Sequence, residues 1–258
     1  MKWRIWTVTS LLLGVAFLGC GSPEEVEVEA PKLTPSQYTA EELVQRYVDA
    51  LGGAEALAGV QTVLKRGSMT TDDFSDAPIL NAIANDTGYL RRIESPSGVI
   101  SLAWDGDVAW QQGAAVGSSE IVRLTERDAM LYRVVSHLAG PLEEAAAKGY
   151  TLTADGRDDE GQEVITVDIP GLGERSYYLD GTTFLVNQVA ELRPSMEAGE
   201  PPMRVVTQYA RYREVEGVKF AFFETTRIPD LGFKQTITWD SIEVNADLGQ
   251  FDFSPPQS

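Results

Sequence analysis

The chain has 258 residues and a formal net charge of −18, and its 43% hydrophobic and 23% charged residues are proportions typical of a globular protein. Because an acidic surface repels phosphate groups, we do not expect nucleic acid as a partner. The single cysteine and single histidine exclude an internal disulfide, a cysteine-rich metal site and a multi-histidine zinc site.

Residues 1–19 have the layout of a secretory signal peptide. Lys2 and Arg4 precede an apolar stretch over residues 5–18, which is too short for a stable membrane-spanning helix. Phe17-Leu18-Gly19-Cys20 resembles the bacterial lipobox, although Phe17 stands where leucine is usual. The resemblance implies cleavage before Cys20 and attachment of lipid to that cysteine. Loss of the two basic residues would leave the mature chain with a net charge of −20.

Residues 20–37 are predicted to connect this lipid anchor to a folded domain. Three prolines and an acidic run over residues 24–29 favour a flexible tether, with an edge strand as the alternative for that run. Such a tether has a typical reach of roughly 20–25 Å. By resemblance to enterobacterial sorting rules, Gly21 in place of aspartate favours the outer over the inner membrane. We therefore expect a periplasm-facing protein of the bacterial cell envelope, held on the membrane through Cys20.

The folded part is predicted to begin with a helix. Thr39 and Glu42 have the spacing of a capping box, apolar residues then recur at helical spacing, and Gly52 suits the end of the helix. A later region has the same apolar spacing after Thr125, a plausible N-cap. Helices are predicted over residues 39–52, 54–58, 125–138 and 142–148.

The remaining segments are rich in valine, isoleucine, threonine and aromatic residues and are separated by turn residues, a pattern typical of strands. Apolar and polar residues alternate, as in Phe233, Ile237 and Trp239 against Lys234 and Thr236, which indicates antiparallel strands with one wetted face. Strands are predicted near residues 60–70, 78–84, 87–94, 98–104, 108–112, 120–123, 150–155, 162–169, 174–180, 184–193, 203–215, 218–228 and 233–244.

These elements predict one domain over residues 38–258, of the mainly β (α+β) class. A long curved sheet must cover its apolar face, and the predicted helices carry matching apolar faces. We therefore expect a single curved antiparallel sheet that forms an incomplete β-barrel, with helices covering the concave face.

Several short motifs resemble the LolA/LolB superfamily of periplasmic lipoprotein carriers and its outer-membrane lipoprotein-sorting relatives. They are residues 50–57, Gly88-Tyr89-Leu90-Arg91-Arg92, residues 102–111 and residues 251–256. The resemblance implies a half-barrel that holds an acyl chain or another lipophilic group between the sheet and the helices. Carriers of this family have an Arg-Pro pair just before the strand that matches residues 88–92, and the arginine latches the helical lid. Here Asn85-Asp86 stands in its place, so we do not expect the same latch in this chain.

The leading hypothesis is a membrane-anchored periplasmic lipoprotein that binds a lipid, acyl or other lipophilic group in a greasy half-barrel cavity, with a role in outer-membrane lipoprotein sorting. The alternative is a ligand-free envelope interaction or sensor module with a filled core and an exposed apolar patch. The sequence has no Gly-x-Ser-x-Gly elbow and no nucleotide-binding glycine motif. We therefore expect no enzyme activity, no cofactor and no metal, and we expect a monomer.

The candidate ligand-binding residues are apolar: Trp104, Trp110, Met130, Leu131, Val134 and Leu138. The two tryptophans flank the Asp105-Gly106 turn and would either line the cavity mouth or pack within the sheet. A two- or four-residue loop would place them on opposite faces, whereas a three-residue loop would place them on one face. The other four form a helical stripe that would either line a cavity or belong to the core.

Three further features of the sequence are given structural interpretations. His137 flanks the helical stripe and is expected to be a packed, hydrogen-bonded side chain. Acidic clusters at residues 72–76 and 155–163 do not have the spacing of an EF-hand loop and are interpreted as solvated turns. Met196 and Met203 lie in or beside a Gly/Pro-rich loop over residues 193–202 that would act as a flap.

Overall fold

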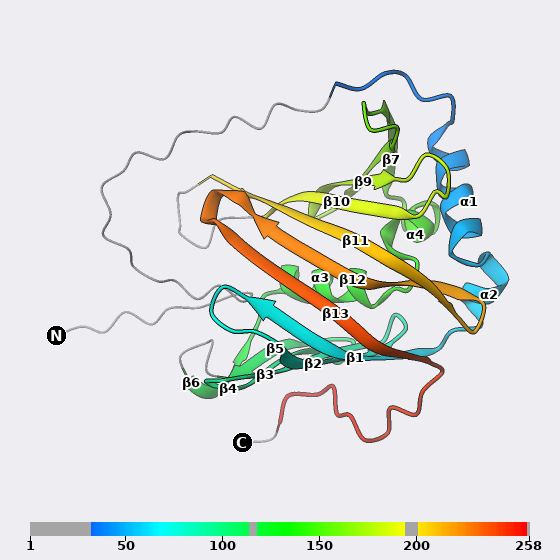
Figure 1. The fold of residues 1–258 in the computed structure, drawn as a ribbon. Coiled ribbons are helices and arrows are strands. Elements are labelled where there is room, and N and C mark those ends of the chain that lie inside the picture. Colours follow the sequence, from blue (N-terminus) through cyan, green and yellow to red (C-terminus); the bar gives the residue numbers. More distant parts are fainter. Residues whose placement is uncertain (1–31, 114–117, 194–200, 257–258) are drawn as a thin grey trace, which may run out of the picture.

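Figure 1 shows the computed structural model, which describes residues 32–113, 118–193 and 201–256. The predicted signal peptide, Cys20, the tether up to residue 31 and Met196 lie outside the described residues. Within the described ranges, none of the helices has the length and apolar character needed to cross a membrane.

The described residues form four α-helices, one short 3-10 helix and one long antiparallel sheet. The helices are α1 (Ala40–Leu51), α2 (Ala54–Ala58), α3 (Glu126–Ser136), α4 (Gly140–Lys148) and the 3-10 helix η2 (Pro229–Leu231). The strands are β1 (Thr62–Thr71), β2 (Ala77–Ala84), β3 (Gly88–Ser95), β4 (Gly98–Trp104), β5 (Ala109–Gly113), β6 (Ser118–Arg123), β7 (Thr151–Arg157), β8 (Glu163–Ile169), β9 (Gly173–Leu179), β10 (Val186–Arg193), β11 (Met203–Val215), β12 (Val218–Ile228) and β13 (Phe233–Val244). The predicted mainly β fold is therefore confirmed, with element ends that differ by a few residues.

The sheet is curved and open. Its strands follow the order β6-β5-β4-β3-β2-β1-β13-β12-β11-β10-β9-β8-β7, and neighbouring strands are antiparallel. A twisted sheet of more than about ten strands tends to curl, and Figure 1 shows the strands wrapping around the helices. Strands β6 and β7 remain as separate edges, so the predicted incomplete barrel is confirmed.

The two edge strands are consecutive in the chain, and α3 and α4 connect them. This connection has to pass from one edge of the sheet to the other, which brings both helices over the concave face (Figure 1). Helix α3 packs against β3, β4 and β5, whereas α1 and α4 pack against β7 and β8. Helix α1 also contacts β12, and α3 contacts α4, so the helices form a connected cover over the concave face.

Local sequence signals fix the ends of the helices. The Thr39 hydroxyl accepts a hydrogen bond from the Glu42 amide at 3.2 Å, and the Glu42 carboxylate accepts one from the Thr39 amide at 2.8 Å, which confirms the predicted capping box. Thr125 and Asp128 form a second capping box at the start of α3. Tyr132 of α3 stacks on Tyr89 of β3, with ring centroids 5.4 Å apart, and so holds α3 on the sheet.

The convex face has its own apolar cluster, covered by the C-terminal segment. Leu64, Leu90 and Trp110 pack there with residues that include Phe251 and Phe253. The Trp110 indole N–H donates a hydrogen bond to the Phe253 carbonyl at 2.8 Å. Gly88 lies so close to the Phe253 ring that an added Cβ would be 3.1 Å from it. Motifs that carry the family resemblance therefore meet on this face, where their role is packing.

The segment before α1 already contacts the sheet. Thr34 and Arg157 exchange both backbone hydrogen bonds, at 2.8 and 2.7 Å, and the Ser36 hydroxyl donates to Glu163 at 2.6 Å. Because β7 is an edge strand, this bridge pairs part of its exposed backbone. The chain therefore joins the domain before residue 38, within the stretch that the sequence assigns to the tether.

The first and last strands of the domain pair at the centre of the sheet, and Gly67 sits at an irregularity in that pairing. The register between β1 and β13 shifts between Arg66 and Gly67. A Cβ built at Gly67 would lie 2.0 Å from the Thr238 carbonyl oxygen and 2.8 Å from the Trp239 Cα. Only a residue without a side chain allows the two strands to approach this closely.

We therefore expect Gly67→Ala to lower the free energy of unfolding by about 1–3 kcal/mol, because the methyl group forces apart the only strand pair that joins the two halves of the described sheet. Urea unfolding followed by tryptophan fluorescence would measure the loss. Ser68→Ala, on the same strand, is the control and should change the midpoint little. An unchanged midpoint for Gly67→Ala would contradict this account.

Candidate functional site

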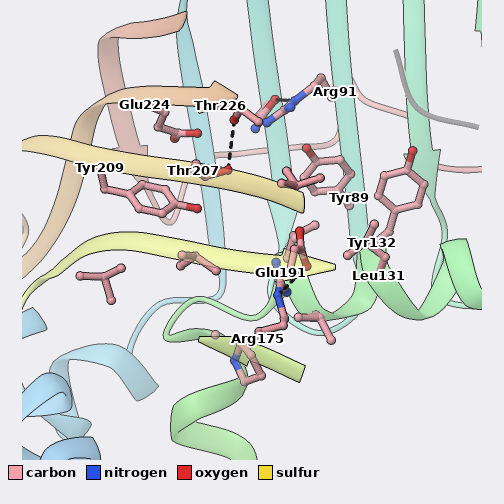
Figure 2. Close-up of a pocket in the computed structure, with 18 of the residues that line it drawn as sticks. Tyr89, Arg91, Leu131, Tyr132, Arg175, Glu191, Thr207, Tyr209, Glu224 and Thr226 are labelled. Carbon is pink, nitrogen blue, oxygen red and sulfur yellow. Dashed lines mark hydrogen bonds and ion pairs between the residues drawn. The ribbon is translucent and has the colours of Figure 1, made fainter. Parts of the chain in front are cut away.

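A cavity of about 390 Å³ lies between the concave face of the sheet and the helices. Side chains from both halves of the sheet face it (Figure 2). Its described lining comes from β1–β4, β9–β13, α1, α3, and the connection from α3 to α4 with the start of α4. The hollow that the sequence analysis expects is therefore present, and it spans the central β1–β13 pair.

One part of the lining is apolar. Leu131, Val134 and Leu138, three of the predicted ligand-binding residues, line the cavity from the region of α3. Ile83 and Ile93 also line the cavity from the sheet, on either side of the paired residues Asn81 and Arg91. Because these side chains come from a helix on one side and strands on the other, the apolar part can enclose a narrow apolar group from two sides.

The rest of the lining is polar, in contrast to the apolar cavity expected from the sequence. Among the described residues that line it, Lys65, Arg91, Arg175 and Arg193 are cationic, whereas Glu191 and Glu224 are anionic. The cavity thus carries more positive than negative side chains, although the chain as a whole has a net charge of −18. Threonine and tyrosine hydroxyls, including those of Thr207, Tyr209 and Thr226, complete the polar part.

Strand register places Lys65, Asn81 and Arg91 in one row. Lys65 of β1 pairs with Asn81 of β2, and Asn81 pairs with Arg91 of β3. All three side chains line the cavity. The Arg91 Nε donates a hydrogen bond to the Asn81 Oδ1 at 2.9 Å, which orients the guanidinium group.

Lys65 is a cation in an apolar and aromatic setting. Its ammonium group lies 5.5 Å from the Trp239 ring centroid and 5.8 Å from that of Phe220, within the range of cation–π contacts. Burial lowers the pKa of Lys65 from its ordinary value of 10.5, and the Glu224 carboxylate opposes this only in part. Glu224 itself accepts a hydrogen bond from the Trp239 indole at 2.7 Å.

The other two cations, Arg175 and Arg193, share one carboxylate within the protein. The Glu191 carboxylate forms an ion pair with the Arg175 Nε at 2.9 Å and another with Arg193. Although burial favours the neutral acid, the two guanidinium groups hold the pKa of Glu191 below its ordinary value of 4.5. Figure 2 shows Glu191 and Arg175 on the opposite side of the cavity from Arg91.

The tyrosines supply neutral hydroxyl groups. Burial raises the pKa of Tyr177 to about 12, and it raises the pKa values of Tyr209 and Tyr212 above their ordinary range. These phenols therefore stay protonated at physiological pH. The Tyr212 hydroxyl donates to the Val186 carbonyl at 2.8 Å, so it helps to fix the lining.

His137 attaches the end of α3 to the turn between β2 and β3. Its Nδ1 lies 3.1 Å from both carboxylate oxygens of Asp86, and its Nε2 lies 2.9 Å from Glu143. The Leu138 amide donates to the Asn85 side-chain oxygen at 3.1 Å. The Asn85-Asp86 pair thus holds the helical cover through an amide and a carboxylate.

The same cluster contains the side chains best placed to hold a metal ion. Single donor atoms of Asp86, His137 and Glu144 lie within 4.8 Å of one another. His137 and Asp86 already contact each other directly, and the Arg133 guanidinium lies 3.7 Å from the Glu144 carboxylate. The buried Glu144 Oε2 accepts no hydrogen bond from the described residues, and we assign the contacts of His137 and Asp86 to the attachment of α3.

The other predicted site residues lie away from this cavity. Trp104 and Ala109 are paired, so four residues separate the strands and the two tryptophans fall on opposite faces. Trp104 belongs to the main core, whereas Trp110 belongs to the convex cluster. The Met130 side chain lies at Gly171. None of these three is among the residues that line the cavity, so the structure brings together only Leu131, Val134 and Leu138.

Sequence reasoning missed the polar part of the site, although a signal was present. Lys65 alternates with Leu64 and Arg66 and so falls on the same face as Val63, which is buried in the core. Arg91 likewise falls between Tyr89 and Ile93 on an inward face. A cation on the apolar face of a strand is unusual, and this is the feature that would have indicated the row.

No family model matches the chain, and no similar sequence was found among curated proteins. Solved structures are similar in fold. A LolA superfamily protein from Nitrosomonas europaea has a TM-score of 0.55 at 11% identity, over 84% of this chain and 98% of that chain. A domain assigned to outer-membrane lipoprotein sorting, from Vibrio parahaemolyticus, has a TM-score of 0.53 at 11% identity, over 83% and 97%. A DUF1329 family protein from Desulfovibrio piger has a TM-score of 0.57 at 10% identity, over 82% and 95%.

This chain has a LolA-like fold. The likeness covers nearly the whole of each solved chain, so the LolA-like part includes the curved sheet together with its helical cover. At these identities the likeness concerns the fold, and the chemistry of the cavity has to be argued from its own residues.

Within this LolA-like sheet, we expect Glu191→Gln to lower the free energy of unfolding at neutral pH by about 2–4 kcal/mol, because it leaves two guanidinium groups without a carboxylate. The pKa of Glu191 is lowered on folding, so its contribution is complete above the ordinary value of 4.5 and is lost as the pH falls through the folded-state value. Denaturant unfolding of both proteins over a descending pH series would show their difference shrink.

Glu174→Gln is the matched control, since Glu174 is an exposed acid on the same strand as Arg175. It should leave stability almost unchanged at each pH. A Glu191→Gln difference that stays constant across the series would show that the carboxylate charge has no part in stability.

Proposed function

We propose that this protein is a lipoprotein of the bacterial cell envelope whose domain binds a lipophilic ligand in its half-barrel cavity. In this proposal residues 1–19 direct export, Cys20 carries the lipid, and the folded domain faces the periplasm. The domain acts by binding, not by catalysis. An outer-membrane location and a part in lipoprotein sorting are in keeping with the fold shared with the Vibrio domain.

The observation that carries the binding role is the cavity itself. Its volume of about 390 Å³ falls near the lower end of the roughly 300–1,000 Å³ that is usual for ligand sites. Side chains of a filled core would occupy this space, which is what the ligand-free interaction module requires. The volume favours a ligand with a single acyl chain over one with several.

The apolar lining determines how much the burial of such a chain contributes to the free energy of binding. Burial of about 200 Å² of acyl surface would contribute roughly 5 kcal/mol. On its own, this corresponds to a dissociation constant only slightly below the millimolar range. A useful affinity therefore requires further contacts, and the polar part of the cavity is where they are available.

We expect Leu131→Trp to weaken binding roughly tenfold, because the larger ring occupies the cavity space that an acyl chain needs. Native mass spectrometry of residues 20–258 with Cys20→Ser, after incubation with a bacterial lipid extract, would show adducts of lipid mass on the parent chain and fewer on the variant. The control is Val99→Trp, since Val99 is exposed and lies outside the cavity lining. Absence of lipid adducts on the parent chain would defeat the proposal.

Anchoring has a separate test. Cys20→Ser removes the thiol that would carry the acyl groups and disrupts the lipobox that directs cleavage, so the full-length variant should keep residues 1–19 and lack acyl groups, whereas the parent protein should be cleaved, acylated and membrane-bound. Fractionation with immunodetection, together with mass spectrometry of the N-terminal peptide, would check both location and acylation. An unmodified Cys20 in the membrane-bound parent protein would contradict the proposed anchor.

A further inference from the structure

The cavity contains two cations that the described residues do not neutralise directly. Within the described ranges, no carboxylate lies within ion-pair distance of Lys65 or Arg91, whereas Arg175 and Arg193 share Glu191. Both side chains are only partly exposed, and removing part of the surface of a charged group from water without a close partner is unfavourable. Two such charges side by side repel each other, so their position is best explained by an anion that they bind together.

The sheet places these cations at a fixed spacing. Lys65 and Arg91 are separated by Asn81 on the intervening strand, so their backbones are about 10 Å apart. Both side chains are long enough to reach a common point from this distance. Since Arg91 uses its Nε to contact Asn81, its terminal N–H groups can form the paired donors that suit a carboxylate or a phosphate.

Apolar residues flank the row along the same strands. Ile83 lies two residues beyond Asn81, and Ile93 lies two residues beyond Arg91, so both share the concave face with the row. Leu102 pairs with Arg91 on the next strand. All three line the cavity. A molecule bound at the row thus has apolar surface on both sides of it along the strands, and Leu102 of β4, a strand that α3 packs against, extends this surface.

We propose that the Lys65–Asn81–Arg91 row binds the anionic headgroup, a carboxylate or a phosphate, of a single-chain amphiphile whose acyl chain lies in the apolar part of the cavity. This inference rests on the proposed function and specifies its ligand class. Acyl chains joined to a lipidated cysteine through ester and amide bonds carry no charge at the junction. The row therefore selects a free anionic amphiphile over the acyl anchor of another lipoprotein, so the inference specifies the lipophilic binding of the proposed function and replaces its part in lipoprotein sorting.

Glu224 restricts the position of that headgroup. It faces the same cavity, and its carboxylate is held by the Trp239 indole, close enough to affect the pKa of Lys65. An anion beside Glu224 would be repelled, so the headgroup has to bind on the Arg91 side of Lys65. Figure 2 shows Arg91 and Glu224 as separate groups around the cavity.

The test compares ligands that share a chain and differ in the headgroup. Residues 20–258 with Cys20→Ser would be titrated by calorimetry with palmitate, with palmitoyl lysophosphatidic acid and with monopalmitoylglycerol, which is neutral. We expect at least one of the two anions to bind roughly ten- to hundredfold more tightly than the neutral lipid. The preferred anion identifies the headgroup as a carboxylate or a phosphate.

Lys65→Met and Arg91→Met should each reduce the affinity for the preferred anion roughly tenfold or more and leave that for monopalmitoylglycerol unchanged. Arg92→Met is the matched control, because Arg92 is the exposed neighbour of Arg91 on the other face of β3. The midpoint of thermal unfolding of Lys65→Met should equal or exceed that of the parent chain, since a buried charge is removed. This result excludes misfolding as the cause of lost binding.

The outcomes separate the two proposals. If none of the three amphiphiles binds, the proposed function fails. If the neutral lipid binds as tightly as the anions, or if Lys65→Met and Arg91→Met leave anion binding unchanged, the headgroup inference is overturned while the lipophilic cavity stands.

Discussion

The arrangement of this molecule depends on one topological constraint. The two edges of the sheet, β6 and β7, are neighbours in the chain, and the connection between them crosses the concave face as α3 and α4. The connection keeps helices between the two edges, and the same helices bury the apolar concave face. The helical cover is therefore built into the chain order, and the cavity is the space that remains between these helices and the strands.

This constraint also explains why ligand-facing residues come from distant parts of the sequence. The pairing of β1 with β13 joins the two meanders of the sheet, and the cavity lies across that junction. Lys65 and Arg91 belong to the first meander, whereas Glu191 and Tyr209 belong to the second. In the cavity, the first meander holds Lys65 and Arg91 without a described carboxylate at ion-pair distance, whereas the second holds two arginines that share Glu191. The two cations of the first half are thus suited to receive an anion.

Much of the fold could be predicted from the sequence because its signals are local. Capping residues, helical spacing and strand alternation depend on neighbours in the chain, and they located the helices and strands. The order of the strands depends on pairing between residues that are far apart, such as Val63 with Val244, which alternation does not encode. The side-chain composition of the cavity follows from that order, and so the sequence could not show which inward polar residues would meet.

The tryptophan pair and the helical stripe show why the positions of single side chains could not be predicted fully from the sequence. The faces taken by Trp104 and Trp110 depend on a loop length that composition does not determine, and the observed four-residue separation sends Trp110 to the convex cluster. On the stripe, Leu131, Val134 and Leu138 line the cavity, whereas Met130 lies at Gly171. Helical spacing predicted the face correctly, but the exact direction of each side chain depends on where α3 rests on the sheet.

The bridge between Thr34 and Arg157 has a mechanical consequence. Tension applied to the N-terminal segment reaches the domain at the edge strand β7, where the first resistance comes from the two backbone hydrogen bonds of this bridge and the contact of Ser36 with Glu163. These bonds would open before the strands of the sheet are loaded. The joint would thus release extra chain length under force while the cavity, which lies on other strands, keeps its shape.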